Sequence, residues 1–132
     1  MTATDPLVEV RQTLPDAAPA WASQVLQSSV TVSFATGDTT LTELARTKLL
    51  AARDAELQAI AELSAKLDAL TINRQTVGEL CELHPRVSAL RDRTAAATKR
   101  QRIVYGDDEV TVVVELDAPA FWRAVSGRQV GR

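Results

Sequence analysis

The sequence contains very few of the residues that build covalent or metal-based sites. Its 132 residues include one cysteine and one histidine, Cys81 and His84. A lone cysteine excludes an internal disulfide and a cysteine-based zinc site, and a lone histidine cannot hold a metal by itself. Gly-rich phosphate loops, dinucleotide fingerprints, HExxH and GxSxG are also missing. The sequence therefore predicts no enzyme, no catalytic residue, no metal and no cofactor, with Cys81 as a half-buried side chain.

Neither one sign of charge nor a long apolar run dominates the chain. The formal net charge is −2 at pH 7, which gives no general attraction for nucleic acid or anionic lipid. Hydrophobic residues make up 45% of the chain, but no uninterrupted run approaches the length that spans a bilayer. We therefore expect no nucleic-acid partner and no membrane-spanning segment. The opening MTATDPLVEV lacks the charged-then-apolar pattern of a secretion signal.

What the sequence does contain is one long helical segment, residues 40–70. The segment has no Gly or Pro and is rich in Ala, Leu, Glu and Lys, which are strong helix formers. Thr40, followed three residues later by Glu43, forms a capping-box pattern. The opposite, charged side includes Asp68 and is expected to face solvent. One apolar stripe is expected to pack inward and consists of Leu49, Ala52, Ile60, Leu63, Leu67 and Leu70.

Strand-like segments lie on both sides of this helix. From Ser28 onward, apolar and polar residues alternate as far as Phe34, the pattern of a half-buried strand. The polar stretch TINRQTV, residues 71–77, predicts a second and more exposed strand. The stretch RQRIVYGDDEVTVVVELD predicts a hairpin that turns at Gly106.

Two shorter helices complete the expected elements. One runs from His84 or Pro85 to Thr98, because proline suits a first helical turn. The other follows Asp117, a capping residue, and ends at Gly127.

The resulting order, β–α–β–α–β–β–α, predicts an α+β fold. We expect a two-layer sandwich in which the long helix packs on a mixed four-stranded sheet. Residues 1–27 are expected to form an extended N-terminal arm, residues 28–126 a single α+β domain, and residues 127–132 a C-terminal tail. Trp21 within the arm either covers an edge of the core or docks on a partner.

Several of these segments together resemble a known family over residues 21–122. They are Pro19-Ala20-Trp21, Ala35-Thr36-Gly37, LARTKLLAARDAELQAIAEL, TINRQTV, EVTVVVELD and Phe121-Trp122. The chain resembles the bacterial outer-membrane small lipoprotein family that includes flagellar lipoprotein P and the N-terminal domain of flagellar assembly protein T.

The resemblance implies a non-enzymatic structural or assembly module of a bacterial cell-envelope machine. Such a module would be a flagellum-associated ring or disc component that acts by protein–protein contact. Its implied partners are copies of itself and other envelope or flagellar proteins. The implied location is the periplasm or the inner face of the outer membrane if a signal sequence was removed, and the cytoplasm otherwise.

A function of a different class remains open. The cations of the segment from Arg91 to Arg102 predict, as an alternative, a cytosolic binding domain for an anionic ligand or nucleic acid. Cations in this position also complement the negative C-terminal end of a helix. The cluster consists of Arg91, Arg93, Lys99, Arg100 and Arg102.

The segment around Arg74 is expected to form the interface of the assembly. Asn73, Arg74 and Gln75 make the strand over residues 71–77 too polar for the middle of a sheet, so we expect it at an edge. We expect these three residues and Trp21 to contact a second copy, with the arm adding to the sheet of its neighbour.

Overall fold

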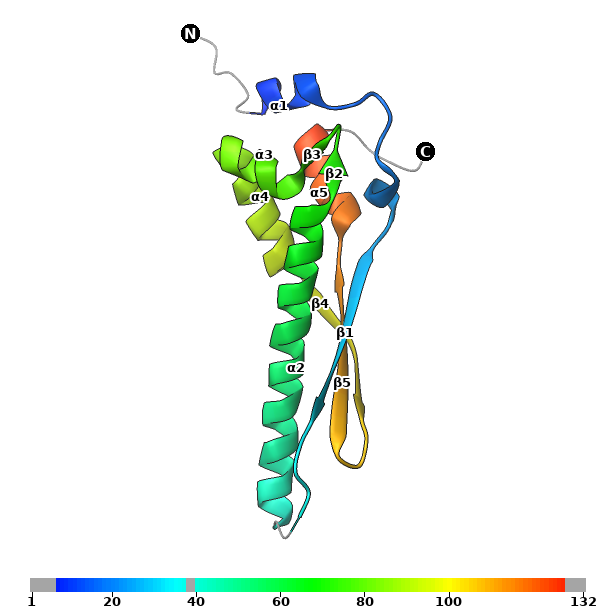
Figure 1. The fold of residues 1–132 in the computed structure, drawn as a ribbon, viewed down its shortest axis with the longest axis vertical. Coiled ribbons are helices and arrows are strands. Elements are labelled where there is room, and N and C mark those ends of the chain that lie inside the picture. Colours follow the sequence, from blue (N-terminus) through cyan, green and yellow to red (C-terminus); the bar gives the residue numbers. More distant parts are fainter. Residues whose placement is uncertain (1–6, 38–39, 128–132) are drawn as a thin grey trace.

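The computed structural model describes residues 7–37 and 40–127. The long helix expected from the sequence is α2, Leu41–Ala69. The capping box predicted at its start is present: Thr40 Oγ1 accepts from Glu43 N, and the Glu43 carboxylate accepts from Thr40 N. Because α2 lies along a small antiparallel sheet (Figure 1), the α+β class with one long helix on a sheet is confirmed.

The sheet has three strands in the order β1-β5-β4 within the described residues. β1 is Leu26–Ser33, β4 is Lys99–Tyr105 and β5 is Glu109–Leu116. Both neighbouring pairs are antiparallel, and β4 with β5 forms the predicted hairpin at Gly106. The expectation of a mixed, four-stranded sheet is therefore wrong. β1 and β4 are the two edges.

The missing strand is a miniature hairpin of its own. β2 (Thr71–Ile72) and β3 (Gln75–Thr76) pair only with each other. Asn73 and Arg74 connect them with φ values of 49° and 75°, the left-handed values that a two-residue type I′ turn requires. Residues 71–77 therefore reverse direction before they can reach the main sheet, and the predicted edge strand is not formed.

Two helices follow this hairpin. α3, Val77–Leu83, begins with a capping box between Thr76 and Glu79 that replaces the predicted strand end. α4, Pro85–Ala96, begins with proline in its first turn as expected and ends two residues before the predicted Thr98. Both helices pack against one end of α2.

The N-terminal segment is folded where an extended arm was predicted. Residues 7–25 contain α1 (Val8–Thr13) and a 3-10 turn, η1 (Ala20–Ser23), and residues 26–27 belong to β1. Leu7, Val10 and Leu14 are buried, and Arg11 Nε donates to Val125 O at 3.1 Å. A helix this short is stable only through such tertiary contacts, which the local sequence does not reveal. Residues 1–6 of the predicted arm and 128–132 of the predicted tail lie outside the described residues.

The closing helix α5, Ala118–Ser126, starts and ends as predicted. Asp117 Oδ1 accepts from Ala120 N, and Gly127 ends the helix with φ 70°. Phe121 and Trp122 of α5 are buried with α1, α3 and α4 at one end of the molecule, which we call the head. The other end in Figure 1, residues 30–37, 40–59 and 103–112, is the distal half. The buried α2 residues there are Ala51, Ala52, Ala55 and Ala59.

Candidate functional site

The apolar stripe predicted on α2 is only partly buried. Leu63 and Leu67 have no exposed surface and Ala52 very little, but Leu49 is 67% exposed. Alanines pack against the sheet in the distal half, so the larger leucines there face outward.

Exposed large apolar side chains concentrate in the distal half. Among the described residues, only Val25 and Leu83 belong to this class and lie elsewhere. Exposed apolar side chains that gather in one region indicate a site of interaction with another molecule more strongly than single residues spread over the whole surface. The distal half is therefore the candidate contact surface of this protein. Its exposed members are Leu41, Leu49, Leu50 and Leu57 on α2 and Val104 and Tyr105 on β4.

The two edges of the sheet differ in charge and regularity. β4 carries Lys99, Arg100 and Arg102, and its pairing with β5 shifts register between Arg100 and Arg102. Charged side chains and bulges on an edge strand discourage pairing with another chain. β1 has eight residues, LQSSVTVS, with no charge and no register shift. The β1 edge is therefore the one that is open to pairing.

Trp21, one of the predicted interface residues, is a core side chain. It is buried, its ring meets that of Trp122 edge-on at 5.9 Å, and its Nε1 donates to Thr71 O at 2.9 Å. Asn73 Nδ2 donates to Thr13 O at 3.1 Å. The structure thus brings Trp21 and Asn73 to one place, where they fasten the N-terminal segment to the β2–β3 hairpin.

The other two predicted residues lie on that same hairpin. Arg74 is exposed at the turn and Gln75 is half-buried on β3. Neither belongs to an edge of the main sheet, because β2 and β3 pair only with each other among the described residues.

Arg91, at the start of the predicted basic segment, is bound within the chain. Its Nε donates to Asp68 Oδ1 at 2.7 Å and its Nη2 to Asp68 Oδ2 at 2.8 Å. These hydrogen bonds to Asp68 raise the pKa of the guanidinium above its ordinary value. Asp68 was expected to face solvent freely, and it instead ties α2 to α4.

The three cations on β4 do not all share one face of the sheet. Lys99 lies opposite Glu115 and Arg102 opposite Val113, on the face of the sheet away from α2. Arg100 lies opposite Val114, which is buried beneath α2. The cations of β4 are therefore divided between the two faces of the sheet, and the anionic-ligand alternative stays a prediction.

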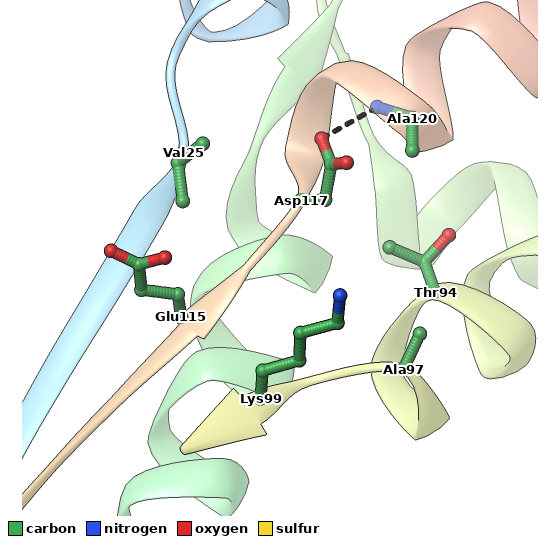
Figure 2. A pocket seen from close by; sticks show the side chains of 7 residues that line it. All are labelled: Val25, Thr94, Ala97, Lys99, Glu115, Asp117 and Ala120. Atoms are coloured by element: carbon green, nitrogen blue, oxygen red, sulfur yellow. Dashed lines mark hydrogen bonds between the residues drawn. The ribbon is translucent and has the colours of Figure 1, made fainter. Parts of the chain in front are cut away.

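A shallow pocket of about 300 Å³ adjoins this segment (Figure 2). Two of its three charged side chains already have partners: Glu115 Oε1 accepts from Gln27 Nε2 at 2.7 Å, and Asp117 caps α5. The pocket offers no nucleophile paired with a base, which an active site for group transfer needs. Its lining is Val25, Thr94, Ala97, Lys99, Glu115, Asp117 and Ala120.

Cys81 lies half-buried on α3. Burial and, to a lesser extent, the carboxylate of Asp68 raise the pKa of its thiol, against the opposing effect of Arg91. A raised pKa keeps the thiol protonated and poorly nucleophilic at neutral pH.

Metal-ligand clusters and membrane-spanning helices are both absent from the described part of the chain. No group of three or more His, Cys, Asp or Glu side chains in residues 7–37 and 40–127 could hold a metal ion. No helix described there is long and apolar enough to cross a membrane. In comparisons with known proteins, no family model matches the sequence, and no curated protein sequence matches it significantly.

Proposed function

We propose that this protein is a non-enzymatic assembly module that acts by protein–protein contact, with itself as the first partner. The observation that carries the proposal is the concentration of exposed leucines on the distal half of α2. Fully burying one leucine side chain is worth about 1.5–3 kcal/mol relative to leaving it exposed. Contact between two such surfaces gains this burial energy, from which the entropy lost on association is subtracted.

The setting of this assembly is a bacterial cell-envelope machine, as a flagellum-associated ring or disc component. This part of the proposal rests on the sequence resemblance over residues 21–122. The same resemblance supports other envelope or flagellar proteins as further partners. It also supports the periplasm, or the inner face of the outer membrane, as the location.

Light scattering of the purified chain at increasing concentration tests the assembly. We expect a molar mass that rises above the 14.3 kDa of the monomer, and we expect Leu57→Glu to shift this rise to at least about tenfold higher concentration. Leu83→Glu is the matched control, because Leu83 is equally exposed but lies on α3 in the head. A strict monomer at high concentration, or equal effects of both substitutions, would contradict the proposal.

A further inference from the structure

One edge of the sheet presents a row of outward-facing backbone groups. Phe34 N donates to Asp108 O at 2.8 Å, just beyond the end of β1. Phe34 therefore forms a hydrogen-bonded pair with the strand opposite. Hydrogen-bonded and non-hydrogen-bonded pairs alternate along an antiparallel ladder, so the other even-numbered residues of β1 also bond to β5. The odd-numbered residues direct their N–H and C=O groups away from it. They are Gln27, Ser29, Thr31 and Ser33.

A side-chain contact agrees with this assignment. Lys66 Nζ donates to Gln27 O at 3.1 Å, so that carbonyl points away from β5. Within the described residues, no other strand pairs with this edge.

We propose that the free edge of β1 pairs antiparallel with the β1 edge of a second copy, about a two-fold axis beside Val30. The inference rests on the proposed function and specifies its first contact. In this register Ser29 lies opposite Thr31 of the second copy, and Gln27 opposite its Ser33. All four outward-facing residues of each β1 are then paired. If one strand is shifted by two residues toward its start, Ser33 lies opposite Val25 of the second copy, which is outside β1.

Self-pairing of β1 fits better than pairing of β1 with β4. β1 carries no charge, so no like charges meet across the two-fold axis. Pairing with β4 would instead place a second copy against three cations and a register shift. It would also be a head-to-tail contact, which closes only for particular rotations.

The position of α2 gives the paired sheet a second layer of contact. α2 packs on β1 and β5, so its axis lies near the seam between these strands. With strands about 4.8 Å apart, the two α2 axes would lie about 10 Å from each other. This separation is close to the spacing of helices in direct contact, about 8–10 Å.

The side of α2 nearest the free edge carries suitable residues. Glu62 accepts a hydrogen bond from Ser28 Oγ, and Lys66 binds Gln27, so these two side chains mark that side of the helix. Ala61 and Ala65, one residue before each of them, are small and exposed. Leu50 and Leu57 lie on a different side of α2, because Asp68 follows them by whole numbers of helical turns and they therefore share its face.

The helix contact is needed as well as the strand contact. A stable interface buries about 1,200–2,000 Å² in total, which one pair of eight-residue strand edges does not reach alone. Arg91 and Asp68 hold α4 on the side of α2 opposite Lys66, so α4 does not cover the side of α2 that faces the β1 edge. Ala61 and Ala65, which are small, let the two α2 helices approach each other closely there.

Disulfide cross-linking tests the register. In a Cys81→Ser background, Ser29→Cys and Thr31→Cys chains are mixed, because these exposed positions would be directly opposite each other. Their Cα atoms would lie about 5.5 Å apart, within the disulfide range of about 4.4–6.8 Å. Identical positions would be diagonal neighbours at about 7–8 Å. We expect the mixture to cross-link at least about tenfold faster than either variant alone.

Proline substitutions test the edge itself. Ser29→Pro removes an outward N–H from β1, and Arg100→Pro does the same on the free edge of β4. Both variants are checked by circular dichroism for an intact fold. Loss of association in Ser29→Pro alone is expected, and equal loss in both would overturn β1 self-pairing.

The remaining outcomes separate the inference from the function on which it rests. Association that persists without any cross-link overturns β1 pairing and leaves the assembly function standing. Faster cross-linking of Ser29→Cys alone overturns the register. A wild-type chain that neither associates nor yields cross-linked variants overturns both proposals.

Discussion

Arg91 on α4 binds both carboxylate oxygens of Asp68 on α2, at 2.7 and 2.8 Å. The Arg91 side chain is only 22% exposed and that of Asp68 is 40% exposed. Arg91 also reaches Asp92 at 3.2 Å. This bidentate ion pair fixes α4 against one side of α2. The side of α2 nearest β1 is not covered by α4.

The Arg91–Asp68 pair contributes measurably to stability. We expect Asp68→Ala to lower the free energy of unfolding by about 1 kcal/mol, because the pair is bidentate but still partly solvated. Leu67→Ala, which empties a fully buried site, should cost about 2–5 kcal/mol. Urea unfolding measures both, with the exposed Glu82→Ala as a control within about 0.5 kcal/mol. An Asp68→Ala variant as stable as the control would show that the pair contributes nothing.

The same pair tunes the reactivity of Cys81. Asp68 raises the pKa of the thiol and Arg91 lowers it, in addition to the larger effect of burial. Asp68→Ala should therefore shift the pH profile of iodoacetamide alkylation to lower pH, and Arg91→Ala should shift it to higher pH. Identical profiles for the two variants would contradict this electrostatic account.

The raised pKa also links folding to pH. Because the folded pKa of Cys81 lies above its ordinary value, its contribution to stability is complete below that value and is lost as the pH rises through the folded pKa. Cys81→Ser should therefore reduce the loss of stability seen in alkaline urea titrations.

The β2–β3 turn is strained at Arg74. Its φ of 75° is unfavourable for a residue with a Cβ, whereas Asn73 tolerates such values better. Arg74→Gly should therefore raise the free energy of unfolding by about 0.5–1 kcal/mol despite the greater freedom of the unfolded chain. Arg74→Ala keeps the Cβ and should change little. Equal stabilities of the two variants in urea would show that the turn carries no strain.

Local signals in the sequence predicted the elements that depend on local chemistry. The capping box at Thr40 and Glu43, the turn at Gly106, and the cap and stop of α5 at Asp117 and Gly127 are all present. Each of these features needs only a few neighbouring residues, so the sequence contains the whole cause.

Elements that depend on distant residues were not predicted. α1 is held by tertiary contacts such as the hydrogen bond from Arg11 to Val125 O. The sequence there has no sustained apolar periodicity that would predict a helix. The Asn73-Arg74 turn lacks the glycine that usually marks a two-residue hairpin, so residues 71–77 resembled one strand. The outward position of Leu49 follows from alanine packing against a narrow sheet.

The candidate site was visible only in part. The uncharged run of β1 can be read in the sequence, but which strands are edges is a property of the whole topology. The sequence allowed Trp21 either to cover an edge of the core or to contact a partner. Its hydrogen bond to Thr71 O places the side chain in the core.

The central claim is that this chain associates with itself through an apolar surface. Sedimentation equilibrium at low and at high salt tests it most directly, because salt weakens charge-based association and phosphate binding but leaves apolar contact intact. The account predicts a weight-average mass that rises above 14.3 kDa with concentration and nearly equal dissociation constants at both salt concentrations. A mass of 14.3 kDa throughout, or an association that disappears at high salt, would contradict it.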